Sequence, residues 1–414
     1  MAKEKKVKLS VNKLKPGLYI DLGLSWSQHP FLFRQFTIKS SSEIKIIQDL
    51  GLMEVTVYPE RCKIDIPKEQ VEQSLAVVDK DQMWEEKKQR IDEAAKYRHT
   101  RNKKSKEYRE RVKQIQNLTK NLKTAPANAI RSAREVADIM SAAFGKESEV
   151  LINLVNFTDD CFTMHHHSLN VTVLTLSIAK ELGITDIELR RLCMGAILHD
   201  IGKASVPAKV LMKKSALTIS EKKLLNTHPL FGGKLARKIE GASDEVAQII
   251  EQHHEYIDGT GYPKKLKGDE IGQLARIVAI TNCYDNLCNP ANTKNALTPK
   301  AAMAILYAKY KDKLDTKIVQ HFIKTMGVYP PGTVVSLSDG SIGLVTAVNS
   351  SSLLQPHILL YHDDVPRSEA LHINLSLHPN LSIKDALISG ECPKRIYDYL
   401  GIRERTGYYY DQLQ

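Results

Sequence analysis

The feature that most constrains the fold of this chain is a set of four apolar helical faces, each of which ends in polar side chains. In each segment, apolar residues recur every three or four positions, which is the spacing along one side of a helix. Because such faces point into a helical core, we expect the polar side chains at their ends to meet inside an all-α bundle. The four segments span residues 167–182, 192–200, 246–254 and 274–285.

The polar side chains at these ends are mostly histidines. A single histidine on an apolar face is usually a core residue whose ring is satisfied by hydrogen bonds. Burying several imidazoles and a carboxylate together without a cation, however, would cost several kcal/mol. A shared cation offsets this cost, and imidazole with carboxylate suits iron, manganese or zinc. The candidate ligands in these segments are His167, His199, Asp200, His253 and His254, and His228, which precedes Pro229, is added to them.

Two other pairs of side chains are weaker candidates. His165 and His166 precede His167, and only one of three consecutive residues falls on the apolar face of a helix. We expect the other two to lie near the surface or to support a ligand. Cys283 and Cys288 do not have the spacing of a metal motif, so we expect them to be core thiols.

The composition is typical of a chain with sizeable cores. With 414 residues, of which 42% are hydrophobic, the chain is long enough for two or three domains. No window approaches eighteen consecutive apolar residues, so we expect no membrane span. The basic N-terminus lacks the apolar stretch of a signal peptide, and the six cysteines form no CxxC pair. These features predict a cytoplasmic protein with free thiols.

The net charge of +11 predicts an anionic partner. A nucleic acid is one such partner, but the sequence contains no duplex-binding motif. Much of the positive charge lies in one segment, residues 96–113. We therefore favour an anionic small molecule over DNA.

Changes in composition divide the chain into four stretches. The first alternates as short strands around one helix, and the second is highly charged and contains no glycine. The third has an almost wholly helical pattern, and strand-like runs follow in the fourth. The predicted domains are a small α/β module (1–66), a charged helical linker (67–125), an all-α core (126–328) and a mainly-β C-terminal segment (329–414).

Within the C-terminal segment, Asp339-Gly340 is a hairpin signal between strand-like runs. We predict that one helix begins at Ile383 and that another runs from Pro393 to Leu400. The pattern assigns no role to Tyr408-Tyr409-Tyr410.

The charged linker carries two apolar faces of helical spacing. Val71, Leu75 and Val78 form one face, and the other lies between Val112 and Leu122. A coiled-coil homodimer through these faces and a solvated single helix are equally compatible with an interrupted repeat of this kind.

The order and spacing of these motifs resemble the HD-GYP subgroup of the HD-domain phosphohydrolases over about residues 150–290. The N-terminal module also resembles a domain often found before HD-GYP units in bacteria. The matching motifs are His167-Ser168, His199-Asp200-Ile201-Gly202-Lys203, His228-Pro229, His253-His254-Glu255 and Gly261-Tyr262-Pro263.

This resemblance implies a bacterial, metal-dependent phosphodiesterase that opens cyclic di-GMP to pGpG, with GMP as an optional further product. It implies two divalent cations, iron or manganese first and zinc as the alternative, with Asp200 bridging them. Lys203 would contact the scissile phosphate, and the Gly261-Tyr262-Pro263 loop would line the site and meet protein partners. A hydroxide between two cations can attack phosphorus in line.

The chain departs from the family pattern at three positions. Asn282 stands where members usually have an aspartate that completes one metal site, and an amide oxygen brings no charge. Thr163 replaces a glutamate that is associated with a third cation, so we expect two at most. After the last of the four helical segments, Lys294 alone retains a positive charge for the substrate.

These departures leave two functions open. The first is an active phosphodiesterase. The second is a weakened or inactive relative that binds a cyclic dinucleotide or a protein and signals by conformation. Another HD-type phosphohydrolase acting on nucleotides is disfavoured by the loop at Gly261-Tyr262-Pro263.

Overall fold

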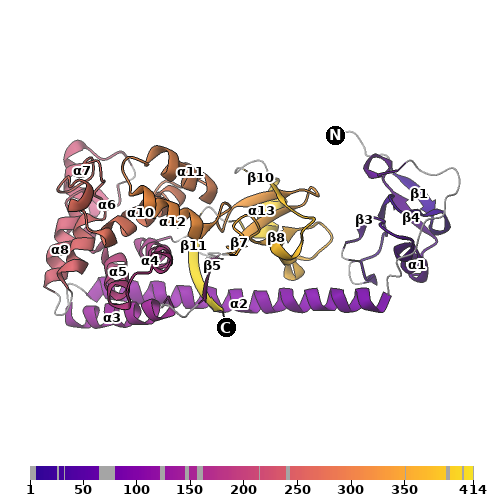
Figure 1. Cartoon of the computed structure of the whole chain (residues 1–414), viewed down its shortest axis with the longest axis horizontal. Coiled ribbons are helices and arrows are strands. Elements are labelled where there is room, and N and C mark those ends of the chain that lie inside the picture. Colours follow the sequence, from indigo (N-terminus) through magenta and orange to yellow (C-terminus); the bar gives the residue numbers. More distant parts are fainter. Residues whose placement is uncertain are drawn as a thin grey trace. The chain divides into compact units, whose positions relative to one another are not determined.

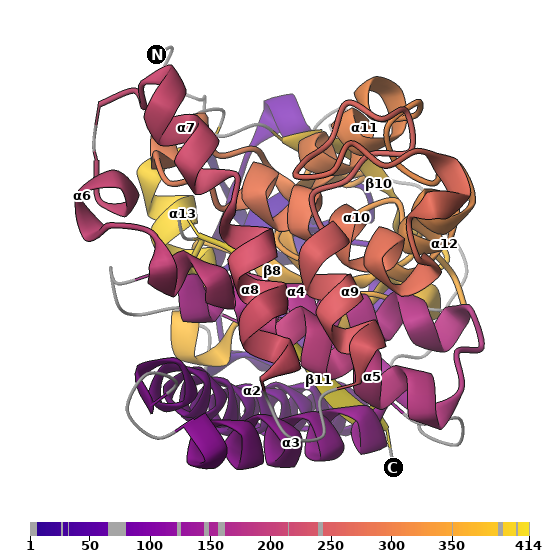
Figure 2. The ribbon, with the colours of Figure 1, turned by 90° about the vertical axis from the view of Figure 1, so that its left-hand side faces the viewer.

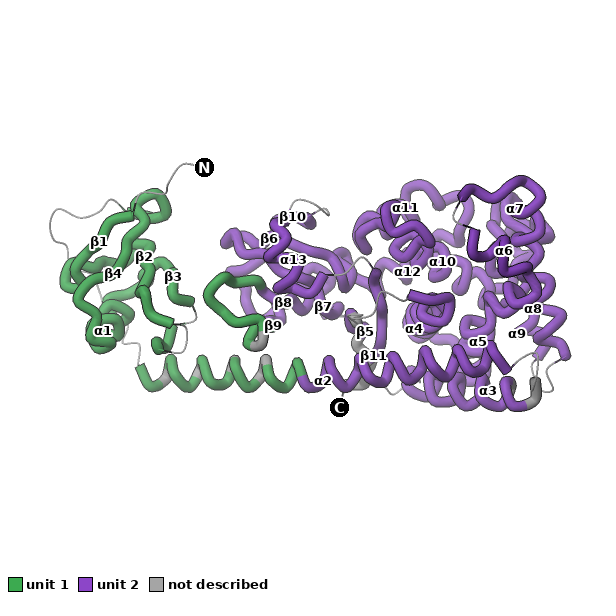
Figure 3. Tube along the Cα trace, turned by 180° about the vertical axis from the view of Figure 1, so that it is seen from behind, with its two compact units in different colours: residues 1–98, 361–372 green, residues 99–360, 373–414 purple. Residues whose placement is uncertain are grey.

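The chain forms two compact units in the computed structural model (Figure 3). Unit 1 comprises residues 1–98 with 361–372, and unit 2 comprises residues 99–360 with 373–414. The division into four domains stays a prediction. The structure describes residues 6–25, 28–31, 33–64, 80–121, 126–144, 149–155, 162–213, 215–238, 243–349, 351–387, 392–402 and 405–413.

Unit 1 contains the expected small α/β module. Its antiparallel sheet has the order β1-β4-β2-β3, and α1 (Ser41–Asp49) packs its apolar side into the module's core. Ser40 begins this helix by accepting a hydrogen bond from the Glu43 N–H at 3.3 Å. The strands are β1 (Val7–Ser10), β2 (Tyr19–Asp21), β3 (Gln35–Thr37) and β4 (Glu54–Val57).

A segment from the C-terminal part of the sequence belongs to the same unit. Arg34 forms an ion pair with Asp364 at 3.2 Å, and Phe33 stacks on the His362 ring at 3.8 Å. Unit 1 therefore combines the N-terminal module with residues 361–372.

The charged linker contains one long helix, α2 (Lys80–Asn121). Val112, Ile115 and Leu118 on this helix are buried in the core of unit 2. These three side chains are therefore not available for the coiled-coil dimer that the sequence suggested. The other apolar face, Val71 to Val78, lies outside the described residues.

The core of unit 2 is helical, as predicted. Helices α4, α5, α8, α9 and α10 lie next to one another and surround the candidate ligands (Figure 2). Helix α4 is buried from His167 to Ala179, which shows that it lies at the centre of the bundle. The helices are α3 (Pro126–Ala143), α4 (Met164–Glu181), α5 (Asp186–Leu198), α6 (Ala208–Leu211), α7 (Ile219–Leu225), α8 (His228–Arg237), α9 (Asp244–Gln252), α10 (Gln273–Cys288), α11 (Pro299–Lys309) and α12 (Thr316–Met326).

The C-terminal segment and β5 together form a sheet with the order β10-β6-β7-β5-β11, and β8 pairs with β7 and β9. Figure 1 labels β5, β7, β8, β10 and β11 of this sheet. The fold class predicted from the sequence, an all-α core with a small N-terminal α/β module and a mainly-β C-terminal segment, is confirmed. The elements are β5 (Glu149–Val155), β6 (Val334–Leu337), β7 (Ile342–Ala347), β8 (His357–Tyr361), β9 (His372–Asn374), β10 (Ile383–Leu387), α13 (Lys394–Leu400) and β11 (Gly407–Leu413).

Two local expectations need correction. The helix predicted from Ile383 is wrong, because β10 begins there and pairs with β6. Strand β5 lies in a stretch that was expected to be almost wholly helical, and its partner β11 is more than 250 residues away in sequence. The three tyrosines that the pattern left without a role, Tyr408-Tyr409-Tyr410, are buried in β11. Alternate residues of a strand face opposite sides, so both faces of β11 are covered.

Within the described residues, none of the helices combines the length and the apolar character that a membrane crossing requires.

Candidate metal centre

The centre of the helical bundle is the Asp200 side chain, which is only 2% exposed. Its Oδ1 lies 3.2 Å from His228 Nε2 and 3.9 Å from His253 Nε2. Its Oδ2 lies 3.5 Å from His199 Nε2 and 3.8 Å from His167 Nε2. The two oxygens of one carboxylate therefore face two different pairs of imidazoles.

These side chains form two groups that could each hold a cation. In each group, the potential ligand atoms lie within 4.8 Å of one another. Asp200 belongs to both groups, which is the position of a bridging ligand. The groups are Asp200, His228, His253 and His254, and His167, His199 and Asp200.

The donor set fits divalent transition metals. Asp200 Oδ1 is buried and makes no hydrogen bond of good geometry, although His228 Nε2 is close. Pairs of imidazole nitrogens also face each other, with 3.2 Å between the Nε2 atoms of His199 and His167. A buried anion surrounded by imidazole lone pairs is costly without a cation and favourable with one.

Backbone carbonyls orient three of the histidine rings. In each case Nδ1–H donates to the carbonyl oxygen three residues earlier, so Nε2 is left to face Asp200. His199 and His253 each cap the C-terminal end of a helix, where such carbonyls are free. The bonds are His199 to Ala196 at 2.7 Å, His228 to Leu225 at 2.8 Å and His253 to Ile250 at 2.7 Å.

His167 is oriented by a carboxylate instead. Its Nδ1–H donates to Asp285 Oδ2 at 2.6 Å, and Asp285 is fully buried. The sequence did not indicate this role, because Asp285 lies almost one turn after Asn282 and is too far round the helix to replace it as a cation ligand. The sequence feature that could have revealed this role is the carboxylate itself, which lies one turn after Thr281 on the buried face of α10.

The electrostatics of the centre favour neutral imidazoles around an ionised carboxylate. Burial lowers the pKa of His199 to about 4 and that of His253 and His254 well below the usual value. Burial alone would raise the pKa of Asp200, but Lys203, His199 and His228 lower it well below its usual value. Neutral imidazole and ionised carboxylate are the forms that bind metals.

The buried histidines predict that the metal-free protein becomes less stable as the pH falls. The folded-state pKa of His199 is about 4 and its ordinary value is 6.5. Between these values the unfolded chain binds a proton that the folded chain does not. The stabilisation from a neutral His199 is thus fully present above pH 6.5 and is lost as the pH falls toward 4. A shift of this size corresponds to about 3 kcal/mol.

Denaturant unfolding of the metal-free protein at neutral and at acidic pH measures this effect. We expect a smaller free energy of unfolding in acid, and a shallower pH dependence in a His199→Gln variant, which lacks that titrating ring. An equal free energy of unfolding of the metal-free protein above pH 6.5 and near pH 4 would contradict the prediction.

The Gly202 position allows two parts of the centre to approach each other. A Cβ atom at Gly202 would lie 1.9 Å from the His228 carbonyl oxygen and 2.5 Å from the Gly232 nitrogen. The short 3₁₀ helix η4 (Ile201–Ser205) can therefore lie directly against the start of α8. One turn after Asp200, the Lys203 Nζ donates to Asp200 Oδ2 at 2.6 Å.

The Gly261-Tyr262-Pro263 loop lies beside the histidines. The Tyr262 ring stacks on His254 at 4.5 Å, and the Tyr262–Pro263 peptide is cis. A Cβ atom at Gly261 would lie 2.3 Å from the Tyr256 nitrogen, so the turn back toward His254 requires glycine.

Glu255 holds the residues that follow this loop, a role that sequence reasoning missed. The buried Glu255 carboxylate accepts hydrogen bonds from the backbone N–H groups of three successive residues. These are Lys264 at 2.6 Å, Lys265 at 3.1 Å and Leu266 at 3.1 Å. The only signal in the sequence was the position of Glu255 directly after the two histidines.

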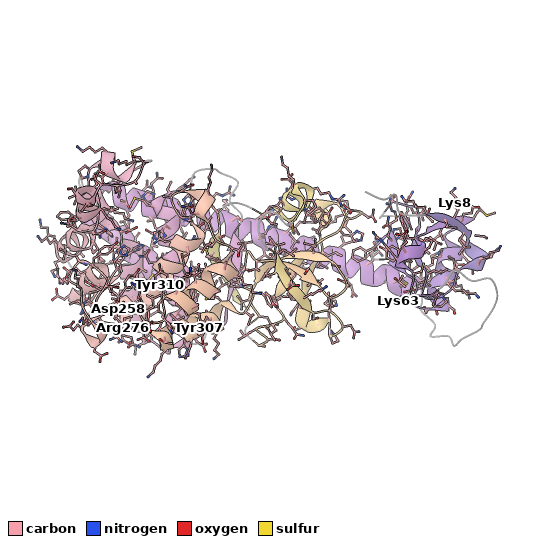
Figure 4. All side chains as sticks on the ribbon, turned by 90° about the horizontal axis from the view of Figure 1, so that it is seen from above. Lys8, Lys63, Asp258, Arg276, Tyr307 and Tyr310 are labelled. Atoms are coloured by element: carbon pink, nitrogen blue, oxygen red, sulfur yellow. The ribbon has the colours of Figure 1, made fainter. Side chains whose placement is uncertain are left out.

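A second set of contacts is made by Arg276, which Figure 4 labels. Arg276 bonds Asp269 at 2.9 Å and Asp315 at 3.1 Å. The segment that carries the loop is thus tied to the start of α10 and to α12.

Asn282 and Lys294 occupy different environments. Asn282 is 3% exposed, and its Oδ1 accepts a hydrogen bond from Asn286 Nδ2 at 2.7 Å. Lys294 is exposed in the 3₁₀ helix η6 (Thr293–Asn295). Lys294 therefore lies outside the buried cluster, and Asn282 accepts hydrogen bonds from Asn286 at both its backbone and its side-chain oxygen.

Thr163 and the two histidines before His167 have local partners at the start of α4. Thr163 caps the helix and accepts a hydrogen bond from the His165 N–H at 3.3 Å. His166 Nδ1 accepts from the Thr163 N–H at 3.1 Å. These contacts give all three residues a structural role at the helix end.

Comparison with known proteins identifies two families of domain. Residues 149–318 match a family model described as an HD domain, and residues 6–133 match a domain of unknown function, DUF3391. Cyclic di-GMP phosphodiesterase PA4108 of Pseudomonas aeruginosa is 28% identical over 368 residues, which cover 86% of this chain and 84% of that protein.

Two further relatives match shorter regions. The cyclic di-GMP phosphodiesterase response regulator RpfG of Xanthomonas campestris pv. campestris is 36% identical over 148 residues, which are 36% of this chain and 39% of RpfG. The 3'3'-cGAMP-specific phosphodiesterase 3 of Vibrio cholerae is 30% identical over 164 residues, which are 40% of this chain and 35% of that protein. The HD-domain match includes Asp200 and every histidine of the centre, so the candidate metal ligands all lie in the region that is similar to HD domains.

Proposed function

We propose that this protein is a metal-dependent phosphodiesterase that hydrolyses cyclic di-GMP to pGpG, with GMP as an optional further product. The observation that carries this proposal is the position of Asp200, whose two carboxylate oxygens face two separate groups of histidines. A shared carboxylate between two cation sites suits the hydrolysis of phosphate esters.

Two divalent cations, iron or manganese in preference to zinc, would complete the centre. His167, His199 and Asp200 would hold one cation, with Asn282 as a weak additional ligand. Asp200, His228, His253 and His254 would hold the other. Bound cations would supply Lewis acidity and a water of lowered pKa.

The other side chains would bind and orient the substrate. Lys203 is 28% exposed at its side chain and lies against Asp200, so its ammonium can reach a phosphate oxygen at the edge of the centre. Lys203 would spread the negative charge that develops on the phosphate. The Gly261-Tyr262-Pro263 loop would line the site, and Lys294 would add a second positive charge for the dianionic ligand.

Cyclic dinucleotides are the substrate class that the relatives support. PA4108 and RpfG are named as cyclic di-GMP phosphodiesterases, and the protein from Vibrio cholerae is named as specific for 3'3'-cGAMP. We place cyclic di-GMP first, and 3'3'-cGAMP is the competing substrate that an assay should include.

A turnover assay tests the proposal. The protein is loaded with Mn²⁺, Fe²⁺ or Zn²⁺ and incubated with cyclic di-GMP or 3'3'-cGAMP, and the linear products and mononucleotides are separated by chromatography. We expect pGpG from cyclic di-GMP. Binding of cyclic di-GMP without turnover, with every metal, would instead indicate a sensor.

Asn282→Asp is expected to strengthen the weaker cation site. Asn286 Nδ2 already donates to Asn282 Oδ1 at 2.7 Å, so it can orient a carboxylate placed there. The added charge should raise affinity for the cation at His167 by about 10-fold and raise turnover at limiting metal. Metal titration and initial rates measure the two effects.

Asn292→Asp is the matched control, because it makes the same chemical change at an exposed residue of the same region. Equal metal affinity in Asn282→Asp and in the unmodified protein would show that Asn282 does not limit the centre.

A further inference from the structure

The carboxylate that orients His167 is itself held by two buried asparagines. Asp285 Oδ1 accepts hydrogen bonds from Asn170 Nδ2 at 2.9 Å and from Asn289 Nδ2 at 2.9 Å. Asp285 and Asn170 are fully buried, and Asn289 is 6% exposed. Because the two amides bond one oxygen and His167 bonds the other, the orientation of the carboxylate is fixed.

Both asparagines are in turn held by the residues that begin the C-terminal strand. Asn170 Nδ2 and Asn289 Nδ2 also donate to the Thr406 carbonyl oxygen, at 3.0 and 2.8 Å. The Thr406 N–H donates to Asn289 Oδ1 at 2.8 Å, and the Tyr408 N–H donates to Asn170 Oδ1 at 3.1 Å. The asparagine side chains thus connect β11 to Asp285.

Helix α2 reaches the same network through one hydroxyl. The fully buried Tyr108 OH donates to Asn170 Oδ1 at 2.9 Å. With this bond, both donors and both acceptor positions of the Asn170 amide are used. A buried network in which every group is satisfied specifies one arrangement of its members.

The start of β11 is anchored on both sides. Strand β11 pairs with β5 in an unbroken antiparallel register from Gly407–Val155 to Leu413–Glu149. Arg405 Nη1 donates to the Pro290 carbonyl oxygen at 2.7 Å. The Thr406 backbone therefore has a defined position next to the end of α10.

We propose that β11 positions the metal ligand His167, and that Asn170 and Asn289 are positioning residues that transmit this effect through Asp285. The inference rests on the metal centre of the proposed function. A histidine binds a metal well only when its second nitrogen is held in place, and loss of such support typically lowers metal affinity 10–100-fold. The C-terminal strand is thus part of the metal centre, although it contributes no ligand.

Asn289→Ala tests this inference directly, because it removes the side-chain bonds of residue 289 to Asp285 and Thr406. We expect the cation held by His167 and His199 to bind 10–100-fold more weakly. The cation held by His228, His253 and His254 should bind as before. Elemental analysis gives the metal content per chain, and titration with Mn²⁺ gives the affinities. The electron paramagnetic resonance spectrum separates a coupled Mn²⁺ pair from a single ion.

Two tyrosine variants provide a matched comparison. Tyr108→Phe removes the hydroxyl that bonds Asn170 at 2.9 Å and that also bonds the His166 carbonyl oxygen at 3.4 Å. We expect a several-fold loss of affinity at the same cation. Tyr284→Phe removes an equally buried hydroxyl, which bonds Tyr408 OH at 3.2 Å, a side-chain contact outside the asparagine network. Tyr284→Phe should lower thermal stability without changing the metal titration.

Each outcome decides the inference separately from the proposed function. Wild-type affinity for both cations in Asn289→Ala would overturn the role of β11, whatever the turnover. If Asn289→Ala does not fold, equal metal affinities in Tyr108→Phe and Tyr284→Phe would overturn it. A protein that binds two cations but hydrolyses no cyclic dinucleotide would refute the proposed function, and the comparison of variants would still stand. A wild-type chain that cannot bind two cations would refute both.

Discussion

Replacing Asp200 with asparagine is expected to leave the protein folded, to prevent it from holding two cations, and to lower cyclic di-GMP turnover about 10³-fold or more. Loss of a residue that only supports a ligand typically costs 10–100-fold, so loss of the shared ligand should cost more. The neutral amide brings no negative charge to offset the charge of the cations. It also has a single oxygen, whereas the carboxylate has one oxygen facing each pair of histidines.

Metal content, single-turnover kinetics and circular dichroism of the Asp200→Asn variant measure these effects. Asp49→Asn is the matched control, because it makes the same chemical change at an exposed carboxylate of unit 1. Two bound cations and near-normal turnover in Asp200→Asn would exclude Asp200 as the bridging ligand.

Gly202→Ala is expected to destabilise unit 2 by about 3 kcal/mol or more, and to separate His228 from Asp200. The new methyl group would lie 1.9 Å from the His228 carbonyl oxygen and 2.5 Å from the Gly232 nitrogen. Both contacts are with backbone atoms, so η4 and α8 must move apart. Since His228 begins α8, this movement would carry a ligand away from the cation that it shares with His253.

Thermal unfolding with and without metal measures this effect. Gly272→Ala is the matched control, because its Cβ would meet only side-chain atoms of Gln248 and Gln252 at 3.6 Å and its φ is −58°. Gly272 precedes α10, where alanine instead of glycine costs less than about 1 kcal/mol. Equal stability losses in the two variants would show that the close approach at Gly202 is not important.

The helical core could be predicted because its signals are local. The apolar spacing after His167 and before His253 is visible within three turns of sequence, and both segments are helices. The strand at β5 was missed because strand pairing is decided by a distant partner. Residues 149–155 pair with residues 407–413, and the sequence around either strand does not indicate its partner.

The candidate site was also predicted unevenly. His199 and Asp200 are adjacent in sequence and bring a carboxylate and an imidazole to the same point, which is why their motif was informative. Lys294 was included by analogy and lies exposed in η6. Asp285 and Glu255 were not assigned roles, because an orienting carboxylate is recognised only by the atoms that it contacts.

By itself, the sequence determined which imidazoles and which carboxylate were candidate ligands. Helical periodicity places His167, His199, His253 and His254 on apolar faces. Asp200 was included because it adjoins His199, and His228 because it precedes Pro229. Only the tertiary structure decided how they meet. It places the two oxygens of Asp200 toward different histidines, turns His167 by means of Asp285, and brings Thr406 to the asparagines that hold Asp285. The bonds from His167 to Asp285 and from Asn170 to Thr406 join residues 118 and 236 positions apart. Their geometry depends on how whole helices and strands pack rather than on any local pattern.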